Sequence, residues 1–181
     1  MKKFELTNEF VTNMFGTKLF RIRALVEFGD VEAGELGGYV EKESNLGHDD
    51  NAWVYDNAWV YGNAWVYGDA QVSGNARVYG DALVYGDARV CGDARVCGNG
   101  DYAYAHGFGS VNRTTTFFRL KDGGVGVRCG CFYGTLAQFR DKIRETHGET
   151  KKAQEYLMLA DLMELRFEED ENEVGNRKYV E

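Results

Sequence analysis

Residues 51–68, "NAWVYDNAWVYGNAWVYG", are nearly the same six-residue word written three times, and they begin the run that decides the fold. The word continues as DAQVSG, NARVYG, DALVYG, DARVCG and DARVCG, so eight consecutive hexads cover residues 51–98. Every hexad begins with Asn or Asp, has Ala second and Val fourth, and ends with Gly, except that Asp56 ends the first. A strict period of this length is typical of a solenoid, and a hexapeptide period indicates a β-helix.

Strand geometry predicts which residues of each hexad form the core. Successive side chains of a strand point to opposite faces, so the second and fourth residues share one side and the third and fifth share the other. Since Ala and Val stand at the second and fourth positions of all eight hexads, we predict that they face the interior. The Gly-Asn or Gly-Asp pair then makes the corner, because these residues adopt left-handed backbone conformations at low cost.

The repeat resembles that of left-handed β-helix proteins, in which a small residue follows an aliphatic one four places on, as Ala58 follows Val54. In that family three hexads make one triangular coil, which implies a left-handed solenoid with 18 residues per turn here. More narrowly, residues 20–98, in which "FGDVEAGELGGYVEKESNL" runs into the repeat, resemble small hexapeptide-repeat proteins of bacteria and their temperate phages. The segment "GCFYGTLAQFRDKIRETHG" resembles a module of phage proteins and implies no specific activity.

The segments outside the repeat predict two caps. "KFELT" and "KLFRIRAL" are strand-like, the glycine-rich stretch 31–50 looks irregular, and "TTTFFRL" and "GGVGVRCGCF" predict a hairpin across "KDGG". A helix should follow Thr135, which has capping-box spacing to Gln138, and a second helix should cover roughly residues 150–167. Such units would cover the open ends of the solenoid, where unpaired strands invite aggregation.

The predicted fold class is therefore mainly β, a short left-handed parallel β-helix with a β cap before it and an α/β cap after it. The expected division is an N-terminal β cap at 1–30, the β-helix at 31–110, an α/β unit at 111–167 and a flexible acidic tail at 168–181.

Composition excludes several classes of function. The chain of 181 residues has 21 Lys and Arg against 29 Asp and Glu, a formal charge of −8, which argues against nucleic acid as a partner. No apolar run approaches the ~18 residues of a membrane span, and "MKKFELTNEF" lacks the apolar stretch of a signal peptide. The four cysteines are then expected to be reduced thiols in a cytoplasm, that of the host cell if the protein is phage-encoded.

Metal and cofactor sites are not predicted. Cys129 and Cys131, with His106 or His147, could suggest a metal site, but zinc sites usually show wider paired spacings. A one-residue gap on a strand puts both sulfurs on one face, and buried structural thiols are the favoured interpretation. The corner column of Asn51, Asp69 and Asp87 could bind a cation, although such columns are more often only solvated.

An 18-residue coil assigns the outward residues to three faces, with residues 18 apart stacked about 4.8 Å from one another. The first face carries Trp53, Gln71 and Arg89, with Tyr55, Ser73 and Cys91. The second carries Trp59, Arg77 and Arg95, with Tyr61, Tyr79 and Cys97. The third carries Trp65 and Leu83, with Tyr67 and Tyr85. The three tryptophans thus form an outward collar, one on each side of the first coil.

Two of these faces are candidate binding surfaces. Arginines beside aromatic rings could grip a flat anionic ligand, which makes the candidate ligand-binding residues Trp59, Tyr61, Arg77, Tyr79, Arg95 and Arg89. The same arginines could instead stack on the tyrosines and do nothing else, and the sequence alone favours this second interpretation. The third face is uncharged, and β-helices similar to this one commonly form parallel trimers, so we expect a homotrimer packed through Trp65, Tyr67, Leu83 and Tyr85.

The favoured functional hypothesis is a non-catalytic phage or prophage protein that binds a host protein or a small anionic, nucleotide-like ligand. A role against host defences is implied by the resemblance alone. The alternative is a hexapeptide acyltransferase that uses a coenzyme A thioester, with His106 as general base. The eight hexads are uninterrupted and contain no histidine, which disfavours an enzyme.

Overall fold

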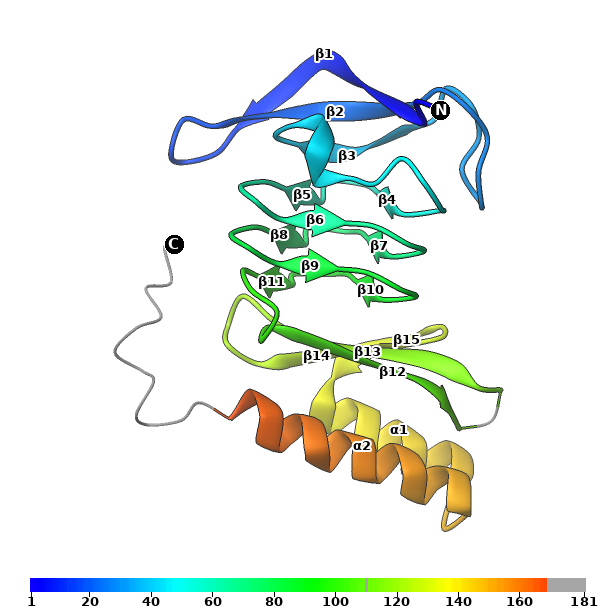
Figure 1. The fold of residues 1–181 in the computed structure, drawn as a ribbon. Coiled ribbons are helices and arrows are strands. Elements are labelled where there is room, and N and C mark those ends of the chain that lie inside the picture. The colour runs from blue at the N-terminus through cyan, green and yellow to red at the C-terminus, as the bar shows by residue number, and fades with distance from the viewer. Residues whose placement is uncertain (110, 169–181) are drawn as a thin grey trace.

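The computed structural model describes residues 1–109 and 111–168. The molecule is built in layers along one axis (Figure 1): a β cap at the N-terminal end, the stacked coils, a four-stranded sheet, and a pair of helices on the far side of that sheet. This is a mainly β solenoid of parallel coils with a β cap and an α/β cap, as the sequence predicts.

The N-terminal cap continues directly into the solenoid. Strands β1 (Phe4–Thr12), β2 (Lys18–Ala24) and β3 (Leu36–Val40) pair in that order as antiparallel neighbours. Strand β3 then pairs parallel with β5 of the first coil, with Tyr39 beside Trp59. The expectation that residues 31–50 are irregular is therefore wrong in part, because they contain β3 and the 3₁₀ turn η1 (Glu43–Asn45).

Glycine allows β3 to lie so close to the coil. A Cβ added at Gly37 would lie 2.5 Å from Val54 O, and one at Gly38 would lie 2.6 Å from Ala58 O. Only residues without a side chain fit there, so the glycine-rich composition that looks irregular in the sequence is what seats this strand on the first coil.

Each hexad supplies one two-residue strand. These strands are β4 (Trp53–Val54), β5 (Trp59–Val60), β6 (Trp65–Val66), β7 (Gln71–Val72), β8 (Arg77–Val78), β9 (Leu83–Val84), β10 (Arg89–Val90) and β11 (Arg95–Val96). They stack parallel as β4-β7-β10, β5-β8-β11 and β6-β9, and each pair joins residues 18 apart, as in Trp65↔Leu83. The second and fourth residues of every hexad are buried, which confirms the Ala and Val core.

The backbone polarity of the stack is uniform. The N–H groups of each coil donate to carbonyls of the next coil along the chain, as Trp53 N does to Ala70 O at 3.1 Å and Arg77 N does to Ala94 O at 2.9 Å. The solenoid therefore presents unpaired carbonyls at its N-terminal end and unpaired N–H groups at its C-terminal end, and the two ends need opposite kinds of cap.

Donors cover the carbonyl end. The Lys3 ammonium donates to Ala52 O at 2.8 Å, and the buried Asn45 amide donates to Ala64 O at 2.8 Å and Gly62 O at 3.2 Å. Backbone N–H groups of β3 and the following segment complete this cover, since Tyr39 N donates to the carbonyl of the coil below it.

Acceptors cover the N–H end. Asn99 Oδ1 accepts from Leu83 N at 2.8 Å, Thr116 Oγ1 accepts from Arg89 N at 2.9 Å, and the Asp101 carboxylate accepts from Cys97 N at 3.0 Å. One acceptor thus serves each of the three faces, and all three lie in the segment that leads into the C-terminal unit or inside it.

The C-terminal unit is one antiparallel sheet covered by two helices. Its strands are β12 (Tyr102–Phe108), β13 (Arg113–Arg119), β14 (Val125–Cys129) and β15 (Phe132–Thr135), followed by α1 (Leu136–His147) and α2 (Lys151–Phe167). The predicted hairpin is β13–β14, and the Thr135–Gln138 capping box is present. Of the predicted acidic tail, only Glu168 lies among the described residues.

The cysteine pair does not share a strand face. Cys129 ends β14 and is half-buried, whereas Cys131 is exposed in the tight turn to β15, after Gly130 with φ of +58°. The prediction of two buried thiols on one face is therefore wrong, because the strand ends before the second sulfur.

Candidate binding faces of the solenoid

The first face is closed by the N-terminal cap. Trp53 points outward from its coil but is 0% exposed, because the rings of Phe4 and Phe28 pack edge-on against it at 6.2 and 5.3 Å between centroids. The predicted outward collar of three tryptophans is wrong on this side, and only two faces of the first coil stay accessible at the tryptophan position.

The second face carries a column of guanidinium groups and rings on the sheet β5-β8-β11. Trp59, Arg77 and Arg95 stand in register on the three strands. The Arg77 guanidinium lies over the Trp59 ring, 4.3 Å from its centroid. The arginine therefore stacks on a tryptophan, and not on a tyrosine as the alternative interpretation expects.

The column extends upward into the cap, which the sequence did not reveal. Tyr39 of β3 lies beside Trp59, and Arg21 of β2 lies over the Tyr39 ring at 5.1 Å and donates to its hydroxyl at 2.8 Å. A signal was present, since Gly38, Tyr39 and Val40 repeat the small–aromatic–Val order of Ala58, Trp59 and Val60.

The neighbouring tyrosines on this face cover each other. The rings of Tyr61 and Tyr79 stack at 5.2 Å with an interplanar angle of 6°. Burial raises the pKa of Tyr79 to about 12, and Cys97 adds to that shift. Burial also raises the pKa of Tyr61, partly offset by the nearby Arg77 and Arg95. Both hydroxyls stay protonated at neutral pH and can donate hydrogen bonds.

Of the three arginines in this column, Arg21 lies 3.7 Å from the Glu9 carboxylate, whereas Arg77 and Arg95 differ from it. Neither Arg77 nor Arg95 has a carboxylate within 4.0 Å among the residues that the structure describes. Burial and the neighbouring Arg77 lower the pKa of Arg95, and Asp93 partly opposes this. Arg95 Nη1 donates to Ala94 O at 2.8 Å and Asn75 O at 3.0 Å, which holds the guanidinium against the sheet.

Arg89 does not join this group. It stands on β10, in register with Gln71 of β7, and this places it on the first face. Its side chain is exposed. Five of the six candidate ligand-binding residues therefore share one face, and Arg89 lies on another.

The third face is an uncharged aromatic ladder. The rings of Trp65 and Tyr67 stack at 4.1 Å, those of Tyr67 and Tyr85 at 5.3 Å, and Tyr104 of β12 meets Tyr85 edge-on at 6.0 Å. Trp65 is 44% exposed and Tyr85 is 42% exposed, while Leu83 is half-buried. The four residues expected at an interface thus form one continuous surface, which Tyr104 extends.

His106 lies outside both faces, on β12 at the rim of the C-terminal sheet. Its Nδ1 lies 2.8 Å from Thr114 Oγ1 and 3.6 Å from Asp87 Oδ2, and its ring is exposed. Asp87 is also the last member of the corner column, whose upper part is joined by a hydrogen bond from the Asn51 amide to Asp69 at 2.8 Å. Within the described residues no three His, Cys, Asp or Glu side chains are grouped so as to hold a metal ion.

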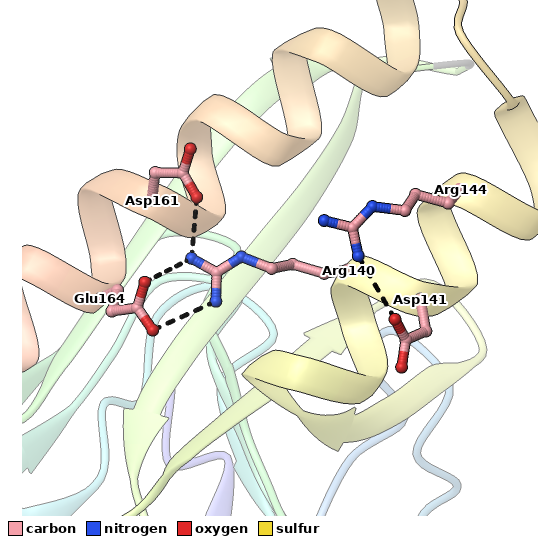
Figure 2. A network of polar contacts seen from close by, with 5 residues as sticks. All are labelled: Arg140, Asp141, Arg144, Asp161 and Glu164. Carbon is pink, nitrogen blue, oxygen red and sulfur yellow. Dashed lines mark hydrogen bonds and ion pairs between the residues drawn. The ribbon is translucent and has the colours of Figure 1, made fainter.

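Charged contacts join the two helices of the C-terminal unit. Arg140 of α1 reaches across to α2, where its guanidinium contacts Asp161 at 2.8 Å and both oxygens of Glu164, the shorter contact at 2.7 Å (Figure 2). These hydrogen bonds raise the pKa of Arg140. Arg144 pairs with Asp141 within α1 at 3.3 Å, so it does not bridge the helices.

Comparison with known proteins supports the repeat and adds no activity. Residues 51–68 and 70–86 match the family model of the YdcK beta solenoid repeat. A search of curated proteins finds no match to the chain. Together with the stacked parallel coils, the match identifies a β-helix repeat protein. None of the helices that the structure describes is long and apolar enough to cross a membrane.

Proposed function

We propose that this protein is a non-catalytic binding protein that holds a small anionic ligand on the second face of its solenoid. The observation that carries the proposal is the pair Arg77 and Arg95, in register on adjacent strands and without a carboxylate partner in the described part of the chain. In a chain with a formal charge of −8, two such neighbouring guanidinium groups repel each other, and an anion between them would relieve the repulsion.

The rings of this face define the kind of ligand. Since Tyr61 stacks on Tyr79 and Arg77 covers Trp59, one face of each of these three rings is already occupied. We therefore propose that a ligand is held mainly by charge and by hydrogen bonds from guanidinium and hydroxyl groups. This favours the phosphate groups of a nucleotide-like molecule as the part that is recognised.

The biological setting is part of the same proposal. The resemblance of residues 20–98 to small repeat proteins of temperate phages supports a phage or prophage protein in the cytoplasm of a host cell. Its action would be to sequester an anionic molecule, or to block a host protein that carries one, and so to oppose a host defence.

Calorimetric titration of the whole protein with tripolyphosphate and with ATP tests the proposal. Each charge-assisted hydrogen bond is worth roughly 1.5–3 kcal/mol, so we expect Arg77→Ala with Arg95→Ala to weaken binding at least about a hundredfold. Arg89→Ala is the matched control, because it removes the same charge from another face, and it should change the affinity less than about threefold. Absence of heat with both probes, or an equal loss in the control, would refute the second face as the site.

The acyltransferase hypothesis has one observation in its favour. Asp87 and Thr114 lie next to the His106 ring, so the imidazole is oriented by neighbours as a general base usually is. Turnover of acetyl coenzyme A that disappears in His106→Ala and persists in the double arginine variant would replace the proposal with this alternative.

We also propose that the third face makes the protein a homotrimer. Trp65, Tyr67, Leu83 and Tyr85 offer ring edges and apolar surface without charge, and this composition is typical of the core of an interface between subunits. In such a trimer the second face would border the cleft between neighbouring subunits.

A further inference from the structure

Helix α2 is apolar on two opposite sides. One side is buried against the sheet and α1 through Ala153, Tyr156, Ala160, Met163 and Phe167. The other carries Met158, Leu162 and Leu165, which are 72%, 54% and 67% exposed. Their spacing of four and three residues places them in one stripe along the helix. We call these three residues the outer stripe.

Helix α1 shows what an ordinary outer face looks like in this unit. Its exposed positions carry the charged residues Asp141, Lys142, Arg144 and Glu145, and its buried residues are confined to one side. Three large aliphatic side chains left in water on α2 are therefore a departure within the same unit, and a contiguous exposed apolar stripe of this kind marks a contact surface.

We propose that the outer stripe is a self-association surface, on which α2 of one chain packs antiparallel against α2 of a second chain. The charges beside the stripe support a second copy as the occupant. Glu155 and Arg166 lie 11 residues apart, which is within about 20° of the same direction around the helix, so both stand on one flank of the stripe. In an antiparallel pair related by a two-fold axis, each flank of one helix lies beside the same flank of the other helix. This arrangement sets Glu155 of one chain against Arg166 of the other, and the symmetry makes two such contacts.

The same axis also fits the apolar residues. It passes midway between Glu155 and Arg166, near residues 160 and 161. Along the contact, Met158, Leu162 and Leu165 of one chain then alternate with those of the other chain instead of meeting the same residue head-on. Interleaved side chains of this kind fill the space between two helices efficiently.

The ion pairs of Figure 2 remove an obstacle to this packing. Asp161 stands on the opposite flank and close to the axis, so the two copies of its carboxylate would approach each other. Its contact with Arg140 at 2.8 Å supplies a compensating positive charge from the same chain. The network thus balances the like-charge contact that the two-fold arrangement creates between the two Asp161 side chains.

Light scattering after size exclusion tests the surface in the full-length protein. Leu162→Glu places two like charges in the centre of the contact and should halve the measured mass. Without a trimer the mass should fall from two chains to one, and with a trimer it should fall to that of three chains, so the outcome is distinct from that of the trimer proposal. Ala137→Glu, at an exposed position of α1, is the control and should leave the mass unchanged.

A charge exchange identifies the partner as a second copy. Glu155→Arg and Arg166→Glu should each raise the dissociation constant of the pair about tenfold, because two attractive contacts become repulsive. The two changes together should return the dissociation constant to within about twofold of that of the native protein. The two positions are about 16 Å apart along one helix, so restoration cannot arise within a chain.

Both side chains also touch main-chain groups of their own chain, Glu155 at Gly109 N and Arg166 at Asn99 O, each at 3.4 Å. Weakening that came only from these contacts would not be restored by the exchange. An unchanged mass in Leu162→Glu, or a double exchange that stays as weak as the single changes, would overturn the proposal.

Discussion

At the scale of single residues, Lys3 is a buried cation with a structural task. Its ammonium group donates to Ala52 O at 2.8 Å and Asp50 O at 3.3 Å, and it lies 4.6 Å from the centre of the Phe28 ring. Burial lowers the pKa of Lys3 from its usual 10.5 to about 8, and the charges of Asp50, Asp49 and Asp69 oppose that shift. The proton on Lys3 is therefore linked to the stability of the N-terminal cap.

We predict that, because of this linkage, the free energy of unfolding rises as the pH is raised above about 8. Between about pH 8 and pH 10.5 the unfolded chain keeps the Lys3 proton and the folded chain releases it, so raising the pH favours the folded state. Urea unfolding at intervals from pH 7 to pH 10 should show the native protein gaining free energy of unfolding relative to Lys3→Met, which has no such proton. A difference between the two proteins that is constant across this range would contradict the prediction.

Residue-level predictions from the sequence succeeded where the period alone decides the environment. The repeated Ala and Val follow directly from strand alternation inside a closed coil. Trp53 has the same position in its hexad as Trp59 and Trp65, so nothing in the repeat distinguishes it. Its burial is caused by Phe4 and Phe28, which come from distant segments of the chain.

At the scale of elements, the corners between the hexads require a particular backbone conformation, with positive φ. Six corner glycines, Gly62, Gly68, Gly74, Gly80, Gly86 and Gly92, have φ between +62° and +71°. Asp56 adopts the same conformation at φ of +54°, and its carboxylate accepts from Gly74 N of the next coil at 2.9 Å. A side chain is thus tolerated at the first corner, where it also makes a hydrogen bond.

Gly80 and Gly98 end hexads on the same face and form a matched pair for a test. A Cβ at Gly80, where φ is +63°, would lie 2.4 Å from Cys97 O, whereas a Cβ at Gly98 would have no atom within 4 Å. We expect Gly80→Ala to lower the free energy of unfolding by more than about 1 kcal/mol, and Gly98→Ala to change it by less than about 0.5 kcal/mol. Urea denaturation of both variants measures the difference, and equal effects would show that the corner does not require glycine.

Elements outside the repeat were predicted less completely. The β13–β14 hairpin and both helices have local signals, namely a Gly-rich turn, a capping box and apolar stripes. Strand β12 was missed because "YAYAHGF" was assigned to the end of the β-helix at 31–110, although the turn residues Asn99 and Gly100 precede it. Strand β15 was missed because Gly130 and Cys131 give a turn too short to stand out. Strand β3 was missed because glycine usually disfavours strands, whereas here it permits close contact.

At the scale of the whole molecule, the caps decide which faces stay available. The N-terminal cap covers the first face at Trp53, and its sheet adds Arg21 and Tyr39 to the second face. On the third face β6 pairs with β9, Leu46 forms a single bridge to Val66, and Trp65 and Tyr85 stay exposed. The 18-residue period predicts which face each outward residue belongs to. Whether a face is accessible depends on the two caps, whose positions the repeat does not determine.

For the third face we predict a measurable loss of assembly. Leu83→Glu with Tyr85→Glu places six carboxylates in the proposed trimer contact and should reduce the mass seen by light scattering by a factor of three. Gln71→Glu, on the first face, adds charge without touching this contact and should leave the mass as it is. A native protein whose mass is not a multiple of three chains would contradict the trimer.

The two ends of the solenoid have opposite hydrogen-bonding groups, and this makes head-to-tail stacking of copies possible in principle. A coil stack that ends in bare carbonyls on one side and bare N–H groups on the other is a template for its own copies, head to tail, with no symmetry that would close the assembly. Side chains of the caps hydrogen-bond to those groups: Lys3 and Asn45 at one end, and Asn99, Asp101 and Thr116 at the other. A second solenoid therefore cannot pair with either end. The caps are thus what keeps a one-dimensional repeat a discrete particle and prevents growth into a filament with two unlike ends.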